Sequence, residues 1–198
     1  MGLTMLRLLL LPMFIWILMT MGDSRQPNRL RWLAIGLFAL MAVTDKLDGY
    51  FARRLNQMTR LGAVLDPIAD KLLIGSALFL LSFSWIAPVG YAVPVAVLLA
   101  VYGKDIGNTL GGLMLFWAVG RAEIGASRLG RLSTVLQFAL VIATLLAPDL
   151  ARVSGGATES MLAALWWGVF LAALGTTVDY AEEASHQCAV YRQRRAVM

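Results

Sequence analysis

The sequence predicts an all-α integral membrane protein with six transmembrane helices. Of its 198 residues, 59% are hydrophobic and 15% are charged, and the mean hydropathy is +0.72. A soluble domain carries about 25% charged residues, so this chain is depleted in charge. A helix needs ~20 apolar residues to cross a bilayer. Six stretches approach or exceed that length: residues 3–21, 30–55, 65–87, 91–119, 132–147 and 161–180.

The first stretch has the start of a secretory signal peptide, with one arginine, Arg7, ahead of an apolar run. No small-residue cleavage site follows at residues 19–24, and the run is long for a signal core. We therefore expect this segment to stay in the mature protein as the first membrane helix.

The connections between the stretches are short, and no internal repeat or low-complexity run is present. We therefore expect residues 1–198 to form a single membrane domain. Pro88, Val89 and Gly90 predict a tight turn between the third and fourth helices. The segment 147–156 is the most linker-like part of the chain.

Arginine placement orients the helices, because cytoplasmic loops are enriched in Lys and Arg. With both termini in the cytoplasm, the inside segments hold nine arginines and the outside loops hold four. The inside set is Arg53, Arg54, Arg60, Arg121, Arg128, Arg131, Arg192, Arg194 and Arg195, and the outside set is Arg25, Arg29, Arg31 and Arg152. This predicts a multi-pass protein of the cell (inner) membrane whose second-to-third helix connection faces the cytoplasm.

The net charge of +5 has two interpretations, membrane topology with attraction to anionic headgroups, or capture of an anionic substrate. Nucleic-acid binding is not expected, because there is no soluble basic domain to present a patch. The single cysteine, Cys188, excludes an intrachain disulfide and a cysteine-cluster metal site.

Four carboxylates lie within 26 residues where the second and third stretches adjoin. Asp45 and Asp48 are spaced i,i+3, and Asp66 and Asp70 are spaced i,i+4, so each pair shares one helix face. Two facing helices would bring all four together. In apolar surroundings such a group cannot stay ionised without compensating positive charge.

The neighbouring arginines do not supply enough charge. Arg53 and Arg54 cannot neutralise four aspartates together with an anionic ligand. Bound divalent cations can, and Mg²⁺ and Mn²⁺ prefer carboxylate oxygens as ligands. The sequence therefore predicts a divalent-cation site.

The carboxylates belong to a longer motif with fixed spacing: Asp45-x2-Asp48-Gly49-x2-Ala52-Arg53-x8-Gly62-x3-Asp66-x3-Asp70. At every fixed position it matches the signature of the CDP-alcohol phosphatidyltransferase family, which the chain resembles over roughly residues 3–137. Within that family it is similar in particular to bacterial phosphatidylglycerophosphate synthases. The resemblance implies a six-helix fold, a homodimer in membrane lipid and two divalent cations, Mg²⁺ or Mn²⁺.

The activity implied by the resemblance is transfer of a phosphatidyl group from CDP-diacylglycerol to an alcohol, with release of CMP. Asp45, Asp48 and Asp66 are expected to bind metal, and Asp70 both to touch the metal site and to act as general base. The first expected acceptor is glycerol 3-phosphate. The alternative acceptor is phosphatidylglycerol, an anionic phospholipid, which would make the chain a cardiolipin synthase.

The resemblance assigns four further residues to the cytidine diphosphate pocket: Gly49, Ala52, Arg53 and Gly62. Small side chains let a nucleotide approach the backbone, and the planar fork of an arginine suits phosphate oxygens. Close helix packing remains an open explanation for the three small residues.

The acceptor-binding candidates are Lys104, Asp105, Arg121, Arg128 and Arg131. Lys104 and Asp105 form an internal ion pair or place Lys104 near the anionic group of the acceptor. They depart from the arginine–glutamate pair expected in the synthases, and an arginine–aspartate pair would be closer to cardiolipin synthases. The arginines serve topology or bind acceptor phosphate. Ser133, Thr134 and Gln137 predict a polar pocket one turn beyond them.

A protein of a different class, a divalent-cation transporter, would also place carboxylates within a membrane. It would not explain Arg53 and the flanking basic loops, which repel cations.

Overall fold

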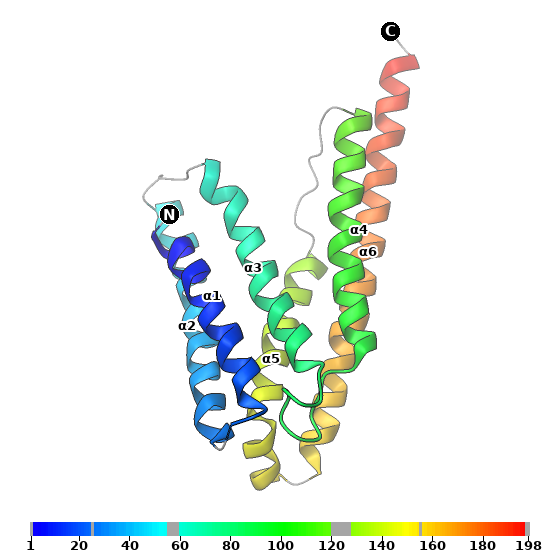
Figure 1. The fold of residues 1–198 in the computed structure, drawn as a ribbon. Helices are drawn as coiled ribbons and strands as arrows, with labels where there is room; N and C mark the ends of the chain where they lie inside the picture. The colour runs from blue at the N-terminus through cyan, green and yellow to red at the C-terminus, as the bar shows by residue number, and fades with distance from the viewer. Residues whose placement is uncertain (1, 25, 55–59, 120–127, 155, 197–198) are drawn as a thin grey trace. The chain divides into compact units, whose positions relative to one another are not determined.

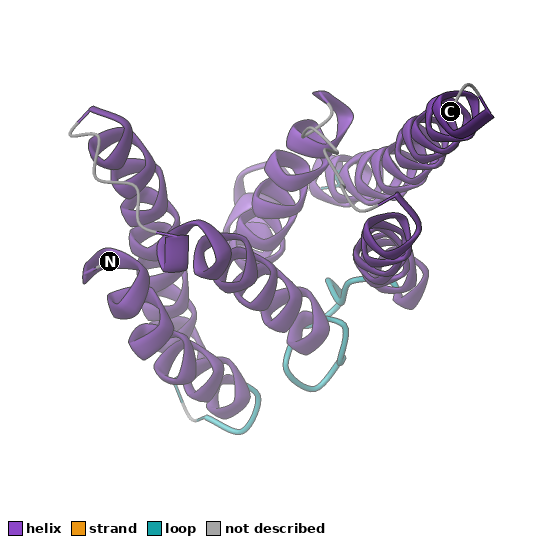
Figure 2. Ribbon diagram, turned by 90° about the horizontal axis from the view of Figure 1, so that it is seen from above, coloured by secondary structure: helices purple, strands orange, loops and turns teal. Residues whose placement is uncertain are grey.

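The computed structural model consists of helices and connecting loops throughout the part of the chain that it describes, which is residues 2–24, 26–54, 60–119, 128–154 and 156–196 (Figures 1 and 2). The helices are α1 (Gly2–Met21), α2 (Pro27–Arg54), α3 (Arg60–Leu81), α4 (Val95–Val119), α5 (Arg128–Ser154) and α6 (Ala157–Ala196). The predictions of an all-α fold and of six helices are confirmed.

The helices group into two compact units. The first comprises Met1–Val93 and Val141–Thr158, and therefore α1, α2, α3 and the second half of α5. The second comprises Pro94–Leu140 and Glu159–Met198, and therefore α4, the first half of α5 and nearly all of α6. The single domain expected over residues 1–198 stays a prediction.

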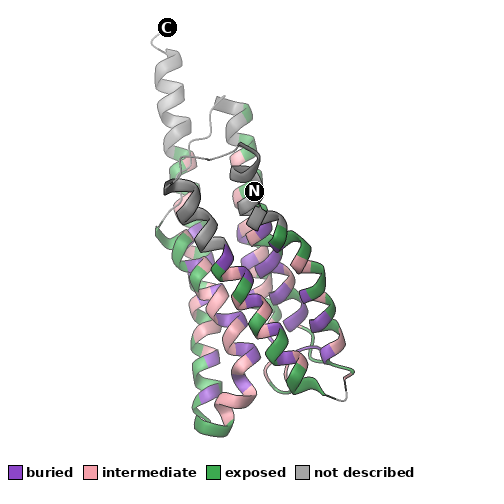
Figure 3. Cartoon of the chain, turned by 90° about the vertical axis from the view of Figure 1, so that its left-hand side faces the viewer, coloured by how far each residue is buried: buried purple, intermediate pink, exposed green. Residues whose placement is uncertain are grey.

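In the first unit, α1 packs against both α2 and α3 (Figure 1). The rings of Phe14 on α1 and Phe38 on α2 lie with their centroids 5.6 Å apart, and both side chains are fully buried. Leu73 and Leu81 contribute buried side chains from α3. Buried and exposed residues are interspersed along the helices (Figure 3), as expected where one side of each helix packs and another faces outward.

The start of α2 is set by local chemistry. The amide of Gln26 donates to the Ser24 hydroxyl, and the carbonyl of Gln26 accepts from the amides of Arg29 and Leu30. Pro27 occupies the first helical position, where its missing N–H costs nothing and its fixed φ suits the helix.

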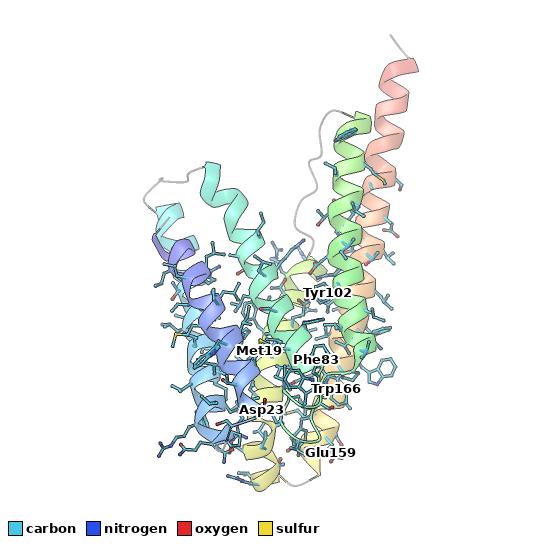
Figure 4. All side chains as sticks on the ribbon, viewed as in Figure 1. Met19, Asp23, Phe83, Tyr102, Glu159 and Trp166 are labelled. Carbon is cyan, nitrogen blue, oxygen red and sulfur yellow. The ribbon has the colours of Figure 1, made fainter. Side chains whose placement is uncertain are left out.

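The loop between α3 and α4 contains the predicted turn. The amide of Tyr91 donates to the carbonyl of Pro88 at 2.9 Å, and Gly90 has a φ of 85°. A positive φ at the second central position is what a type II turn requires, and glycine adopts it without strain. Helix α3 ends at Leu81, earlier than the predicted 87, and the ring of Phe83 just beyond it meets Phe79 edge-on (Figure 4).

The expectation of a linker at 147–156 is wrong for most of that segment. Helix α5 continues through Pro148 to Ser154, although a proline inside a helix removes one backbone hydrogen bond. Asp149 fixes this part of α5 to α2, because its Oδ2 accepts a hydrogen bond from the guanidinium of Arg31 at 2.6 Å. Arg31 is 5% exposed, and Arg152 lies 3.6 Å from the other oxygen of Asp149.

Close approaches at glycine hold the second unit together. The ring of Tyr180 on α6 lies where side chains at Gly111 and Gly112 on α4 would stand. Gly175 on α6 faces Leu129 on α5 in the same way. A Cβ at Gly175 would lie 3.3 Å from a side-chain methyl carbon of Leu129. In lipid the hydrophobic effect does not bring helices together, because lipid tails are as apolar as the side chains. Close van der Waals packing at small residues therefore supplies much of the attraction between helices.

Helix α6 is 40 residues long and ends at Ala196, well beyond the predicted 180. Its last part is polar, so an apolar span does not reveal it, but alanine, glutamate, glutamine and arginine favour helix. At 1.5 Å per residue α6 measures about 60 Å, roughly twice the thickness of a bilayer's hydrocarbon.

Two helical segments among the described residues are long and apolar enough to cross a membrane, Arg128–Ser154 and Ala157–Ser185, and Leu6–Met21 is a shorter apolar helix. Large apolar side chains also face outward on other helices. Leu9, Met114 and Trp117 are 75%, 70% and 82% exposed. Outward-facing apolar side chains of this size are typical of lipid-exposed surfaces.

The end of α1 offers a test of the packing in the first unit. A Cβ at Gly22 would overlap the backbone carbonyl oxygen of Trp85, which no side-chain rotation can move aside. We expect Gly22→Ala to destabilise the protein by about 1–3 kcal/mol. Gly36→Ala is the matched control, because its Cβ meets nothing within 4 Å and alanine favours helix. Thermal melting in detergent measures both, and an equal melting temperature for the two variants would contradict the contact.

Candidate active site

The carboxylate motif lies where α2 ends and α3 begins. Asp45 and Asp48 stand nine and six residues before the end of α2, and Asp66 and Asp70 stand six and ten residues after the start of α3. At 1.5 Å per residue these positions lie at matching depths of about 9–15 Å from the two helix ends. Figure 1 shows the N-terminus at this same end of the first unit.

The side chains of seven motif residues lie outside the described part of the structure: Asp45, Asp48, Gly49, Ala52, Arg53, Gly62 and Asp66. Their helices are described, so the i,i+3 and i,i+4 spacings do place each carboxylate pair on one helix face. The convergence of all four carboxylates stays a prediction.

Asp70 is the motif carboxylate for which a side-chain contact is described. Its Oδ1 accepts a hydrogen bond from NH1 of Arg7 at 3.1 Å, which joins α3 to α1. The Arg7 side chain is 2% exposed, whereas Asp70 is 30% exposed. The pair thus combines a deeply buried cation with a carboxylate that stays partly accessible.

Arg7 was not among the site residues predicted from the sequence. One signal could have revealed it, because Arg7 is the only charged residue in the apolar stretch 3–21. A charge within an apolar helix needs a partner, and the partner is commonly functional. Which carboxylate it would meet could not be read from the sequence, since the contact spans 63 positions.

The donor set suits a divalent cation of the Mg²⁺ type. The motif offers only carboxylate oxygens, which hard cations prefer, and one of these carboxylates is already held by a charge-assisted hydrogen bond. Among the residues with described side chains, no group of three or more acidic, histidine or cysteine residues occurs that could hold a metal elsewhere. The residues present therefore fit the metal that the motif predicts.

A second polar group lies in the second unit and consists of Lys104, Asp105, Ser133 and Gln137, here called the Lys104 cluster. Lys104 is 7% exposed, and its Nζ lies 3.4 Å from both the Ser133 hydroxyl and a carboxylate oxygen of Asp105. The Gln137 amide donates to the same hydroxyl at 3.1 Å, and Ser133 and Gln137 are also buried. The predicted ion pair of Lys104 with Asp105 is confirmed.

The polar residues near the start of α5 therefore contact a second helix, and the pocket expected there stays a prediction. Ser133 stands five residues into α5 and meets Lys104 from α4, which the sequence analysis had not linked to it. Arg128 and Arg131 are exposed on the first turn of α5, one turn nearer its start. Arg121 lies outside the described residues.

Comparison with known proteins identifies the family. Residues 1–176 match the family model described as CDP-alcohol phosphatidyltransferase. The chain is 34% identical over 191 residues to a probable phosphatidylglycerophosphate synthase of Mycobacterium tuberculosis (strain H37Rv), which covers 96% of this chain and 83% of that protein. It is 34% identical over 151 residues to the CDP-diacylglycerol–glycerol-3-phosphate 3-phosphatidyltransferase of Bacillus subtilis (strain 168), covering 72% of this chain and 74% of that one.

A third relative is similar over a shorter stretch. An enzyme of Pseudomonas fluorescens with the same description as the Bacillus protein is 48% identical over 79 residues, or 39% of this chain and 37% of its own length. The chain belongs to the CDP-alcohol phosphatidyltransferase family. It is therefore an enzyme and an integral membrane protein, and the transporter alternative is set aside.

The carboxylate motif predicts a strict metal requirement. We expect transfer to cease in excess chelator and to return when Mg²⁺ or Mn²⁺ is added. Asp66→Asn should lower turnover by roughly 100-fold or more, since even outer-shell changes at metal sites cost 10–100-fold. Asp23→Asn, which alters an exposed aspartate outside the motif, is the matched control and should leave turnover unchanged. Full turnover in chelator, or equal turnover in the two variants, would rule out this site.

Proposed function

We propose that the enzyme transfers the phosphatidyl group of CDP-diacylglycerol to glycerol 3-phosphate, giving phosphatidylglycerophosphate and CMP. The observation that carries this proposal is the similarity to relatives described as glycerol-3-phosphate 3-phosphatidyltransferases, which extends over 72% of the chain in the Bacillus protein. The buried cation of the Lys104 cluster supports this proposal, because the phosphate of glycerol 3-phosphate is an anion that a buried ammonium group could bind.

The carboxylate motif is proposed to bind the donor. Asp45, Asp48, Asp66 and Asp70 are proposed to hold two divalent cations, Mg²⁺ or Mn²⁺. Bound there, the cations would neutralise the diphosphate of the donor and the charge of departing CMP. Gly49, Ala52 and Gly62 would admit the cytidine diphosphate, and Arg53 would bind its phosphate oxygens through two N–H groups.

The chemical step requires a proton acceptor and an aligned hydroxyl. Asp70 is proposed to take the proton of the acceptor hydroxyl as its oxygen attacks the lipid-side phosphorus. A new P–O bond forms to the acceptor, and the bond from that phosphorus to the oxygen of CMP breaks. The chain shows no covalent nucleophile in the motif, so we propose a direct displacement with both substrates bound.

Acceptor binding is proposed to use the Lys104 cluster. An ammonium, a hydroxyl and an amide within hydrogen-bonding range of one another resemble the donors that bind a phosphate, and burial strengthens each contact. Asp105 would hold Lys104 in place rather than touch the phosphate. Arg121, Arg128 and Arg131 are the further candidates near the start of α5.

One observation favours a second candidate acceptor. Asp105 matches the second residue of the arginine–aspartate pair expected of cardiolipin synthases, whereas position 104 holds lysine in place of arginine. Phosphatidylglycerol would then be the acceptor, and cardiolipin the product.

The membrane arrangement is proposed on the same basis. All six helices would span the cell (inner) membrane as one domain, with both termini and the carboxylate motif on the cytoplasmic side. We further propose a homodimer, as the family resemblance implies.

The acceptor can be identified by product analysis. Purified enzyme with CDP-diacylglycerol and Mg²⁺ is expected to make phosphatidylglycerophosphate from glycerol 3-phosphate and no cardiolipin from phosphatidylglycerol. Mass spectrometry of the lipid made in each separate incubation decides between them. Cardiolipin formation without any product from glycerol 3-phosphate would overturn the proposed acceptor and leave the donor chemistry standing.

Replacing Lys104 by a neutral residue tests its proposed role in acceptor binding. Lys104→Gln should raise the KM for glycerol 3-phosphate by roughly 10–100-fold, the equivalent of the 1.5–3 kcal/mol of a hydrogen bond to a charged group. The KM for CDP-diacylglycerol should stay the same. Arg152→Gln removes an exposed charge elsewhere and is the control, expected to change neither constant. A larger effect of Lys104→Gln on the donor KM than on the acceptor KM would argue against this role.

A further inference from the structure

Arg7 is the most deeply buried charged side chain described in the first unit, at 2% exposure. It stands in the second turn of α1, close enough to the helix end for a long side chain to extend toward the aqueous interface. The guanidinium instead lies inside the unit and donates to Asp70 on α3. The contact therefore directs Arg7 toward the carboxylate motif rather than toward water.

The ion pair fixes one side of Asp70. A carboxylate on a helix has several rotamers, and a donor at 3.1 Å selects those in which Oδ1 points to Arg7. Arg7 itself can move little, because the side chains around it enclose almost its whole surface and α1 packs on both α2 and α3. A rigid donor thus holds a carboxylate that remains 30% exposed.

We propose that Arg7 is a positioning residue of the transfer reaction, which holds the carboxylate of Asp70 in the orientation needed to receive the acceptor proton. This inference rests on the proposed function, and specifically on the role of Asp70. Arg7 is proposed to touch neither substrate and to act on the reaction through Asp70.

A buried arginine can also serve packing alone, and Arg31 provides the comparison. Arg31 is buried and pairs with an aspartate, Asp149, in the same unit. Arg31→Gln and Arg7→Gln therefore remove the same groups from similar surroundings. Their effects on folding should be alike, and their effects on the reaction should differ.

The first experiment compares turnover in the two variants at a temperature where circular dichroism shows both folded. Arg7→Gln is expected to lower kcat about 100-fold, the size of loss that follows a misplacement of about 1 Å at a reacting group. Arg31→Gln should stay within about threefold of wild type, as expected where no transition-state contact is lost. Equal kcat values in the two variants would overturn the proposal.

A double-mutant cycle tests whether Arg7 acts through Asp70. In an Asp70→Asn background, with residual turnover followed by radiolabelled acceptor, adding Arg7→Gln should cost less than about threefold, because residues that act as a unit are not additive. A further loss of about 100-fold in that background would show that Arg7 acts independently and would overturn the proposal.

Two further measurements keep the test decisive. Calorimetric binding of CMP with Mn²⁺, without acceptor, should be weakened no more in Arg7→Gln than in Asp70→Asn, because Asp70 is itself proposed to touch the metal site, and a larger loss in Arg7→Gln would contradict action through Asp70. If Arg7→Gln does not fold, Arg7→Lys takes its place. The lysine keeps the charge but not the planar fork, so kcat should fall while the KM for CDP-diacylglycerol holds, and an unchanged kcat would overturn the proposal.

The cycle also separates this inference from the proposed function. It is run with whichever acceptor the wild-type enzyme uses, so a finding that the product is cardiolipin leaves the Arg7 test intact. An additive cycle with phosphatidylglycerophosphate as product would remove the role of Arg7 and leave the proposed function in place.

Discussion

The structure depends on one constraint, that a charge removed from water must meet an opposite charge. Among the described side chains, three cations are buried, Arg7, Arg31 and Lys104, and each lies against an aspartate. Leaving one partner alone in an apolar interior costs about 3–5 kcal/mol, so each pair constrains the elements that carry it. Arg31 fixes α2 to α5, Arg7 fixes α1 to α3, and the contact of Lys104 with Ser133 joins α4 to α5.

The same three pairs differ in what surrounds them. Arg31 and Asp149 are far from the motif along the helices, and nothing in the chemistry of their surroundings suggests a ligand. Asp70 belongs to the carboxylate motif, and Lys104 has a hydroxyl and an amide beside it. A structural ion pair and a functional one are therefore told apart by their neighbours rather than by their own geometry.

The sequence predicted the helices where apolar length is the deciding property, and it predicted the turn at Pro88–Gly90 because proline and glycine restrict the backbone locally. It failed where tertiary contacts decide. Helix α5 continues past Pro148, where Asp149 meets a residue 118 positions away, and α6 continues past 180 in a polar sequence with high helix propensity. The motif aspartates could be found from spacing, whereas the partner of Arg7 depends on how α1 and α3 pack.

The position of the N-terminus bears on how the protein is handled. Helix α1 begins at Gly2, only five residues before Arg7, so its first turns belong to the same end of the first unit as the carboxylate motif. A bulky fusion at this end would crowd the helix that holds Asp70. Helix α6, by contrast, carries no residue of the carboxylate motif and ends at Ala196. Affinity tags and fluorescent reporters joined after α6 therefore leave α1 and its contact with Asp70 unaltered.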